Sequence, residues 1–370
     1  DRYRDESGDV VLLSDVDMAG TTEWTPIGTA ENPFTGTFNG KNFAIKNISW
    51  TADAAKSTAH GLFGVLEKAT VKNLTVGSTG DKITVTGTAG AGTAIAGVAA
   101  FATESVIESV TNNVSISFEA EDPAGTLVML AGIAGQMSGT TIGGTSAAVK
   151  CANNGDITTG PIANTGNGGT GMQVGGICAY IKSAENNLIG YCTNNGRVNA
   201  PSGRGGGLAG TFEKGTIANS LNNGLIEDDA AGQYAGQKNQ YGIKRMGGLV
   251  GGTVTNNNIR IEYCTNNGNV FSQLGCRTGG FVGHNQATIV GCVNKGIILA
   301  NITLDAGAPQ HGPGWACGYS AKGLVTQCAK GGRVGEWDTW KDNPSGAPEA
   351  TNDNALCYRN SEYFDPSQNY

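Results

Sequence analysis

A short glycine-bounded motif recurs along the chain and limits most strongly what the chain can fold into. Each copy reads Gly, two apolar or small residues, then Gly or Ala, and successive copies are roughly 30 to 45 residues apart. The copies are residues 61–64, 97–100, 132–135, 176–179, 207–210, 248–251 and 280–283, with a degenerate copy at 315–318. Repeats of this length are typical of solenoids and propellers, whose units bury apolar side chains only by stacking on their neighbours.

A second motif follows each glycine motif in the same frame. It places an apolar residue three positions before a small or apolar one and then turns, as in Ile189, Cys192 and the turn 194–196. Six residues after Cys192 comes the β-branched Val198, and this spacing holds in seven consecutive repeats. Asn and Gly tolerate the left-handed backbone of a tight corner, so each repeat is predicted to form three short strands separated by turns.

Stacking of such repeats predicts an all-β fold, a single-stranded right-handed parallel β-helix of about nine coils with terminal caps. Coils about 4.8 Å apart would form a rod roughly 45 Å long, and the right hand follows the crossover rule. The expected organisation is a capping segment at 1–35, the β-helix at 36–335 and an aromatic cap at 336–370. A β-propeller is the rival fold, but the Trp-Asp and Gly-His marks of propeller blades are missing.

Five of the nine cysteines share one position of the repeat. That position is filled by Cys151, Cys192, Cys264, Cys292 and Cys328, and elsewhere by Ile48, Leu74, Val110 and Ser220. Exchange with aliphatic residues indicates a small buried packing site, whereas a reactive thiol would need exposure and a neighbouring base. Cys178 and Cys317 in the glycine motif are interpreted in the same way. Cys276 and Cys357 lie outside the frame and have no assigned role.

The repeat resembles a known family. A Gly-Gly-Leu-Val-Gly strand followed by Ile-x-x-Cys-x-Asn-Asn-Gly-x-Val is similar to the GLUG-type repeat of bacterial cell-surface proteins, found also near a family of immunoglobulin A peptidases. Residues 24–29 and 33–42 resemble the entry segment of such proteins, especially from gut Bacteroidetes. The resemblance implies an exported, adhesin-like molecule, secreted or anchored at the outer membrane. It brings no catalytic residues.

Composition narrows the range of partners. Lys and Arg total 24 against 31 Asp and Glu, and no basic patch is present, so nucleic acid is not an expected partner. No apolar run approaches the roughly 18 residues of a membrane span. No signal peptide precedes Asp1, so we expect either a cytosolic protein or a processed or trimmed product of export. We expect a monomer without cofactor or metal.

The outward positions of the repeat do not supply the chemistry of a polysaccharide-cleaving enzyme. Glycosidic cleavage needs two carboxyl groups about 5–9 Å apart, and the predicted outward positions pair no carboxylates on neighbouring coils. The acidic run Glu227-Asp228-Asp229 is interpreted as a solvated loop, and His284 as a polar turn residue. We therefore predict a non-catalytic adhesin-like or glycan-binding module. The alternatives are a polysaccharide lyase or glycoside hydrolase of the pectate-lyase-like type, and a purely structural stalk.

Long connections between repeats are the expected place for a binding surface. The loops around 158–174, 227–246 and 299–314 would emerge along one edge of the rod, where insertions in repeat proteins often bind ligands. The candidate contact residues in them are Tyr234, Tyr241, His311 and Trp315, and the expected partner is a glycan or a host surface protein. The plainer interpretation is that these loops only cover one side of the rod.

Overall fold

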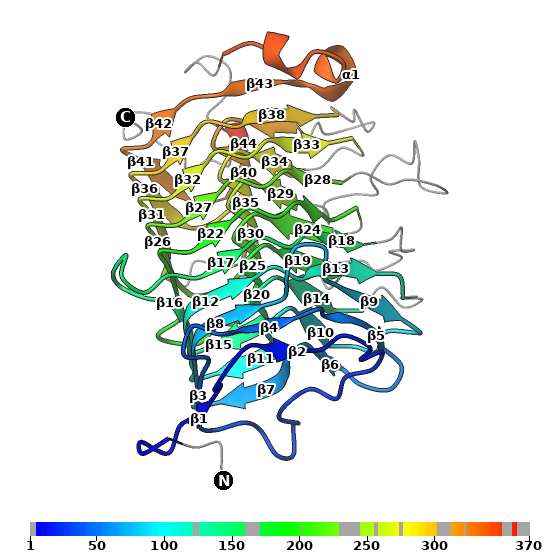
Figure 1. Cartoon of the computed structure of the whole chain (residues 1–370). Helices are drawn as coiled ribbons and strands as arrows, with labels where there is room; N and C mark the ends of the chain where they lie inside the picture. The colour runs from blue at the N-terminus through cyan, green and yellow to red at the C-terminus, as the bar shows by residue number, and fades with distance from the viewer. Residues whose placement is uncertain are drawn as a thin grey trace.

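Strands of successive repeats lie side by side in parallel and wind into a stack of coils, as Figure 1 shows from the N-terminal end at the bottom to the C-terminal end at the top. The computed structural model describes residues 5–120, 126–159, 171–201, 203–228, 245–254, 258–273, 277–301, 312–321, 323–349 and the backbone of 357–360. The chain is a parallel β-helix, as the repeat predicts. Four sheets, named A to D, run along its length.

Sheets D and B meet at the glycine motif. Sheet D contains β6 (Ala59–His60), β10 (Thr93–Ala96), β14 (Val128–Ala131), β19 (Met172–Gly175), β24 (Gly203–Gly206), β29 (Arg245–Gly247), β34 (Arg277–Gly279) and β39 (Gly312–Gly314). Sheet B contains β7 (Phe63–Glu67), β11 (Ala99–Thr103), β15 (Ala134–Ser138), β20 (Cys178–Ile181), β25 (Ala209–Phe212), β30 (Val250–Thr253), β35 (Val282–Asn285), β40 (Cys317–Ser320) and β44 (Cys357–Asn360). The motif therefore forms the corner between two sheets.

Sheet A follows sheet B and consists of two columns of strands. The first column is β1 (Val10–Val11), β3 (Thr37–Asn39), β8 (Thr70–Val76), β12 (Val106–Asn112), β16 (Thr141–Gly143), β21 (Leu188–Gly190), β26 (Gly215–Ala218), β31 (Ile259–Glu262), β36 (Thr288–Val290) and β41 (Leu324–Thr326). The second is β2 (Val16–Asp17), β4 (Ala44–Lys46), β17 (Ala152–Asn153), β22 (Thr193–Asn194), β27 (Leu221–Asn222), β32 (Thr265–Asn266), β37 (Val293–Asn294) and β42 (Ala329–Lys330). β8 and β12 are long enough to pair in both columns.

Sheet C completes each coil. It contains β5 (Ser49–Asp53), β9 (Lys82–Thr86), β13 (Ser115–Phe118), β18 (Ile157–Thr159), β23 (Val198–Asn199), β28 (Ile226–Glu227), β33 (Val270–Ser272), β38 (Ile297–Ala300) and β43 (Arg333–Glu336). A coil thus has four sides and, where sheet A is divided, five strands, so the prediction of three strands per repeat is wrong. One extra strand arises because the glycine motif is a corner that separates a strand of sheet D from a strand of sheet B. The other comes from a break in sheet A, where a residue such as Tyr191 or Tyr263 takes a φ of 54° and divides one predicted strand into two.

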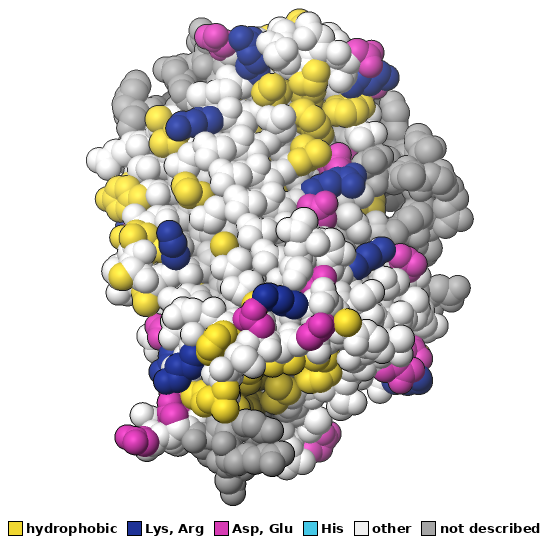
Figure 2. Space-filling view, viewed as in Figure 1, with side chains coloured by type: hydrophobic (Ala, Val, Ile, Leu, Met, Phe, Trp, Pro, Cys, Tyr) yellow, Lys and Arg dark blue, Asp and Glu magenta, His cyan; other side chains and the backbone are white. Residues whose placement is uncertain are grey.

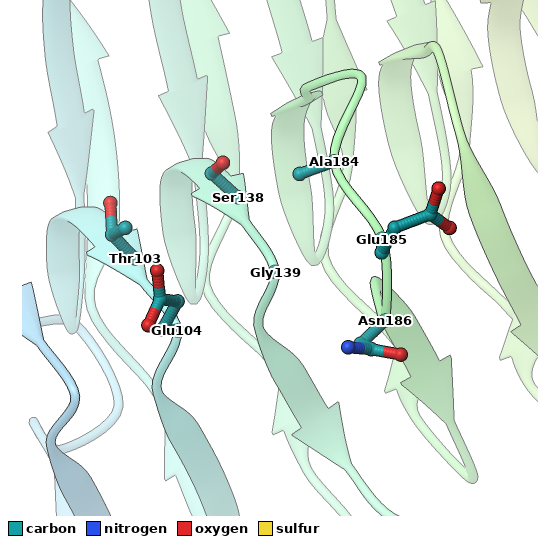
Figure 3. A pocket seen from close by; sticks show the side chains of 7 residues that line it. All are labelled: Thr103, Glu104, Ser138, Gly139, Ala184, Glu185 and Asn186. Atoms are coloured by element: carbon teal, nitrogen blue, oxygen red, sulfur yellow. The ribbon is translucent and has the colours of Figure 1, made fainter.

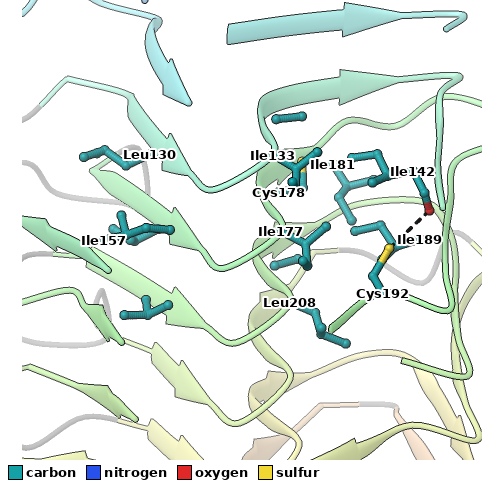
Figure 4. Packing of buried hydrophobic residues seen from close by; sticks show 14 of the residues in the cluster. Leu130, Ile133, Ile142, Ile157, Ile177, Cys178, Ile181, Ile189, Cys192 and Leu208 are labelled. Atoms are coloured by element: carbon teal, nitrogen blue, oxygen red, sulfur yellow. Dashed lines mark hydrogen bonds between the residues drawn. The ribbon is translucent and has the colours of Figure 1, made fainter. Parts of the chain in front are cut away.

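The core is a set of stacked columns of equivalent side chains. The predicted inward positions of sheets A and C are buried, for example Ile189 beside Ile142 and Val198 beside Ile157. Figure 4 shows this packing, with the Cys192 thiol directed at the carbonyl oxygen of Ile142 at 3.4 Å.

The cysteine column is confirmed as a packing site. Cys151, Cys192, Cys264 and Cys292 are at most 1% exposed, and Cys328 is half-buried. None of these five cysteines forms a disulfide among the described residues. Burial raises the pKa of the Cys178 thiol to about 12, which keeps it protonated and unreactive at neutral pH.

Two ladders of asparagine side chains run along the corner between sheets A and C. The inner ladder is Asn112, Asn153, Asn194, Asn222, Asn266 and Asn294, in which each amide donates to the next at 2.8–2.9 Å. The outer ladder runs over the exposed Asn113, Asn154, Asn195, Asn223 and Asn267. The inner amides also donate to the carbonyl two residues on, so they hold the Asn-Gly turns as well as the stack.

Both chain ends carry strands that pair with the stack. β1 and β2 pair in parallel with β3 and β4, and β44 extends sheet B by pairing with β40, with Cys357 opposite Cys317. Helix α1 (Trp337–Trp340) and the 3₁₀ turn η1 (Pro344–Gly346) follow β43, as the top of Figure 1 shows, and the Trp337 ring lies 5.6 Å from that of Phe271. Tyr363, Phe364 and Tyr370 of the predicted aromatic cap lie outside the described residues. No helix among the described residues is long and apolar enough to cross a membrane.

Candidate functional site

The outer faces of sheets D and B fold against each other and bury a second layer of side chains. The last residue of the glycine motif makes this possible, because a Cβ on Gly210 would lie 2.7 Å from the backbone nitrogen of Val174 in sheet D. In the first coils this contact is apolar and forms a cluster separate from the main core: Ala94, Ala100, Met129, Ala131 and Ala179. We call this contact between the two sheets the seam.

From β19 onward the seam changes from apolar to polar. In sheet D, Met129 is paired in register with Gln173, Gln173 with Arg204, Arg204 with Arg245, and Arg245 with Arg277. We call Arg204, Arg245 and Arg277 the arginine column. Strands of one sheet lie about 4.8 Å apart, so three guanidinium groups are stacked on consecutive coils.

Sheet B supplies the opposite wall of the seam. Arg204 donates from Nη1 to Thr211 Oγ1 at 3.0 Å, and the same hydroxyl is hydrogen-bonded to the Gln173 amide oxygen. The aliphatic stem of Arg245 lies on Gly252, where an added Cβ would be 2.8 Å from Arg245 Cδ. The seam therefore holds the arginine side chains in place at two successive coils.

Aromatic rings enclose the last arginine of the column. Arg277 Nη1 is 3.2 Å from His284 Nδ1, and its Cζ lies 4.3 Å from the centre of the Tyr319 ring. The His284 and Tyr319 rings meet edge to face at 5.0 Å. A guanidinium over an aromatic face gains a cation–π attraction that partly offsets its loss of water.

Burial determines the protonation of the seam. Burial, followed by repulsion from Arg204 and Arg277, lowers the pKa of Arg245 to about 8, and burial lowers the pKa of Arg204 to about 10. Burial and the three arginines lower the pKa of His284 to about 2, so its ring is neutral. The Nε atoms of Arg204 and Arg245 have no hydrogen-bond partner among the described residues.

The acidic group nearest to the column is already engaged. Glu213 attracts Arg204 electrostatically, but its carboxylate accepts the hydroxyl of Tyr180 and, at 2.9 Å, the backbone N–H of Ser183. Burial and this carboxylate raise the pKa of Tyr180, which keeps its hydroxyl a donor. No carboxylate of the described residues forms an ion pair with Arg204 or Arg245.

A hollow in the surface lies at the corner between sheets B and A. It has a volume of about 420 Å³, and Figure 3 shows its lining: Thr103, Glu104, Ser138, Gly139, Ala184, Glu185 and Asn186. Glu104 pairs with Lys68 at 3.8 Å, and Glu185 pairs with Lys214. Among the described residues no three His, Cys, Asp or Glu side chains are placed to hold a metal ion. Because its acids are matched by lysines, this hollow is a weaker candidate than the seam.

Of the four predicted contact residues, the described part of the chain contains only Trp315. Trp315 is only 4% exposed and packs edge to face on Phe281 at 5.9 Å, so the prediction that it is a contact residue is wrong. Its place in the degenerate glycine motif turns it into the core. Tyr234, Tyr241 and His311 lie outside the described residues, as do the central parts of the three loops. The flanking strands show that these loops connect sheet C to sheet D.

Two other interpretations of polar residues need correction. His284 lies within β35 and faces the arginine column, so the assignment to a turn is wrong. Glu227 lies in β28 and pairs with Arg197, while the Asp228 carboxylate accepts the Ser272 hydroxyl at 2.8 Å, so these two acids are buried rather than solvated. Both errors arise because an irregular repeat hides which positions lie inside a strand.

Sequence reasoning missed the arginine column, although a signal was present. Arg204, Arg245 and Arg277 each stand three residues before the first Gly of a glycine motif. His284 stands four residues after Gly280, the first Gly of its motif, just as Thr211 stands four residues after Gly207 in an earlier coil. A search of the repeat for charged residues at fixed offsets would have found the column. It would not have shown that these two positions face each other.

Comparison with known proteins adds similarity of fold alone. No protein-family model matches the sequence, and a search of curated proteins finds no match. A solved structure of a proposed immunoglobulin A1 protease from Bacteroides ovatus is 17% identical over 88% of this chain and 78% of that one, with a TM-score of 0.40. An IgA1 protease structure is 14% identical over 86% of this chain but 20% of that one, with a TM-score of 0.37. Neither likeness bears on the chemistry of the seam.

Proposed function

We propose that this chain is a non-catalytic, adhesin-like module of an exported bacterial surface protein and that it binds a glycan at the seam. The observation that carries the proposal is the change from apolar to polar residues within one structural position. Ala94 and Met129 fill this position in the first coils, so the fold does not require the arginines that follow. Buried charges without an acidic partner cost stability, and proteins keep such features mainly at functional sites.

The seam offers the groups that usually recognise sugars. Guanidinium forks donate several hydrogen bonds in fixed directions, and aromatic rings offer flat apolar faces to a sugar ring. Arg204 and Arg245 supply the guanidinium groups on successive coils, and Tyr319 supplies an aromatic ring two coils beyond Arg245. Glu213, the acidic side chain that the described residues place near them, is bound to Tyr180 and Ser183, which favours binding over acid catalysis.

The alternative, a polysaccharide lyase, requires a group in the seam that takes a proton from a sugar ring. It also requires Arg245 to contact the substrate directly.

The test combines a binding assay with a product assay on the whole chain. We expect binding on a glycan array, or to a host surface protein, with no unsaturated or reducing-end product from the same polysaccharides. Product that disappears in Arg245→Gln would overturn the proposal in favour of the lyase. If neither binding nor product is detected in any assay, the remaining function is that of a structural stalk.

A further inference from the structure

We propose that Arg204 and Arg245 form an anion-binding subsite, and that the ligand is an acidic glycan whose carboxylate or sulfate group bridges the two guanidinium groups. This inference rests on the proposed glycan binding and names the class of glycan. It depends on three observations: the stacking of the two arginines, the absence of an acidic partner for them among the described residues, and the fixed positions of their side chains in the seam.

The two arginines are neighbours in register on consecutive coils. Their guanidinium groups are therefore offered side by side, with the coil spacing of about 4.8 Å between their backbones. Thr211 occupies one nitrogen of Arg204. The Nε atoms of both arginines are buried and have no partner among the described residues, so a ligand would reach the two guanidinium groups through their Nη atoms. A planar acid group accepts two parallel hydrogen bonds from one guanidinium and has lone pairs left for a second.

Three other arginines of the described residues form ion pairs with acidic side chains, whereas Arg204 and Arg245 do not. Arg197 pairs with Glu227, Arg260 with Glu262 at 2.9 Å, and Arg333 with Glu349 at 3.7 Å. On the face shown in Figure 2, several basic side chains likewise lie directly beside acidic ones. Arg204, only 7% exposed, keeps its charge in the seam without such a partner. An anion from outside the chain would supply the missing charge.

The electrostatics of the seam point to a local attraction of anions. The chain as a whole has a net charge of −7, so a polyanion gains nothing from the general field of the molecule. Burial lowers the pKa values of both arginines, and a bound acid group would restore their preference for the charged form. Half-burial of Arg245 leaves part of its side chain at the surface, where a ligand can reach it.

The geometry favours an acidic glycan over an acidic peptide. In an extended peptide, side chains on one face are about 6.6 Å apart, which does not match neighbouring coils. A single acid group on a sugar ring can bridge the coils of Arg204 and Arg245, while further sugar units extend along the seam. Gln173 lies one coil before Arg204 and Tyr319 two coils beyond Arg245, so an oligosaccharide is needed to reach either group from the bridged pair.

The experiment compares Arg245→Gln and Arg204→Gln with the matched control Arg260→Gln, whose arginine lies on sheet A with 51% of its side chain exposed. Calorimetric titrations use a galacturonate tetrasaccharide, a heparin tetrasaccharide and the neutral maltotetraose as probes. We expect wild type and Arg260→Gln to bind at least one acidic probe, and both seam variants to bind it about tenfold or more weakly. Maltotetraose should not bind.

Thermal unfolding separates a binding role from a structural one. If the arginines only support the fold, Arg245→Gln should lower the melting temperature. We expect it to keep or raise the melting temperature, because it removes a buried charge without a partner. Added sulfate should raise the melting temperature of wild type more than that of Arg245→Gln, because only the site-bound part of the stabilisation is lost in the variant.

The outcomes separate this inference from the proposed function. A neutral glycan that binds wild type and Arg245→Gln equally would overturn the subsite and leave the binding module intact. Stronger sulfate stabilisation of wild type than of Arg245→Gln, with no glycan bound in any assay, would support the subsite and overturn the glycan as its ligand. Equal behaviour of wild type and both seam variants with every probe and with sulfate would overturn the inference.

Discussion

Buried amides hold the coils in register at the level of single residues. Asn194 is fully buried, donates to Asn222 and to the carbonyl of Gly196 at 2.9 Å, and accepts from Asn153 at 2.8 Å. Its neighbour Asn195 makes the same kind of ladder contact in solvent. The two ladders differ mainly in burial, so they offer a direct comparison of what burial adds to a hydrogen bond.

Asn194→Ala should destabilise the protein far more than Asn195→Ala. The first change leaves a donor on Asn153 and the carbonyl of Gly196 without their Asn194 partner, and it leaves Asn222 Oδ1 with only the backbone N–H of Gly224. We expect this loss of buried hydrogen bonds to cost about 3 kcal/mol. The second exposes its former partners to water and costs at most about 1 kcal/mol. Urea denaturation of the two variants measures the difference. Equal losses would show that the inner ladder does not contribute through burial.

We expect His284 to make the folded protein less stable as the pH is lowered. Burial, followed by Arg245 and the other two arginines, lowers its pKa to about 2 from an ordinary 6.5. Below pH 6.5 the His284 ring therefore binds a proton in the unfolded chain but not in the folded protein. The stability due to the neutral ring is present above pH 6.5 and is lost as the pH falls toward 2.

Denaturation midpoints of wild type and His284→Gln, compared from pH 6.5 downward, test this expectation. The wild-type midpoint should fall more steeply, because carboxylates contribute equally to both proteins. Parallel curves would contradict the buried, neutral His284 and the positive surroundings that exclude its proton.

At the level of elements, the glycine motif is a corner that admits no side chain. A Cβ on Gly207 would lie 2.2 Å from Asn222 Cγ and 2.4 Å from the carbonyl oxygen of Gly248. The first glycine of the motif thus lets sheets D and B turn directly over the inner asparagine ladder. Because this corner needs a residue without a side chain, glycine recurs there in successive repeats, and the motif is visible in the sequence.

Gly207→Ala should cost about 3 kcal/mol, at the upper end for overpacking, because its nearest contacts are a buried amide and a backbone oxygen. Gly90→Ala is the matched control, since the nearest atom to its Cβ, Thr58 Cγ2, is 4.0 Å away. Urea denaturation of both variants checks the expectation. A Gly207→Ala protein as stable as the control would contradict the close approach at the corner.

The sequence predicted the inward columns better than the number of strands. Alternating Ile, Val and Cys at fixed offsets identify buried columns, and Ile189, Cys192 and Val198 all lie where predicted. The break in sheet A was missed because Tyr191 and Tyr263 adopt a left-handed backbone there. Sequence rules associate that conformation with Gly and Asn, and tertiary packing overrides them at these tyrosines.

At the level of the whole molecule, the seam depends on an angle between two sheets. The periodicity of the sequence shows which side chains point outward from a strand, but it does not show that the outer faces of two sheets pack against each other. Arg245 and Gly252 stand at fixed offsets from one motif, yet only the sharp corner makes them touch. For the same reason, the presence of an aromatic residue beside a loop did not identify a binding residue, since Trp315 belongs to the core.

Stacking of equivalent residues on consecutive coils is the central claim, since both the core and the arginine column depend on it. Paired cysteine substitutions on the exposed ladder test it directly. Asn195 and Asn223 touch on neighbouring coils, with 2.8 Å between their amide groups, whereas Asn195 and Asn267 are two coils apart, roughly 9–10 Å. A disulfide spans only neighbouring coils, because it requires Cα atoms within about 7 Å.

The deciding measurement is peptide mapping after mild oxidation of two double variants. Asn195→Cys with Asn223→Cys should form an intramolecular disulfide, and Asn195→Cys with Asn267→Cys should not. A disulfide in the second variant, or in neither, would contradict the register on which the β-helix and its seam are built.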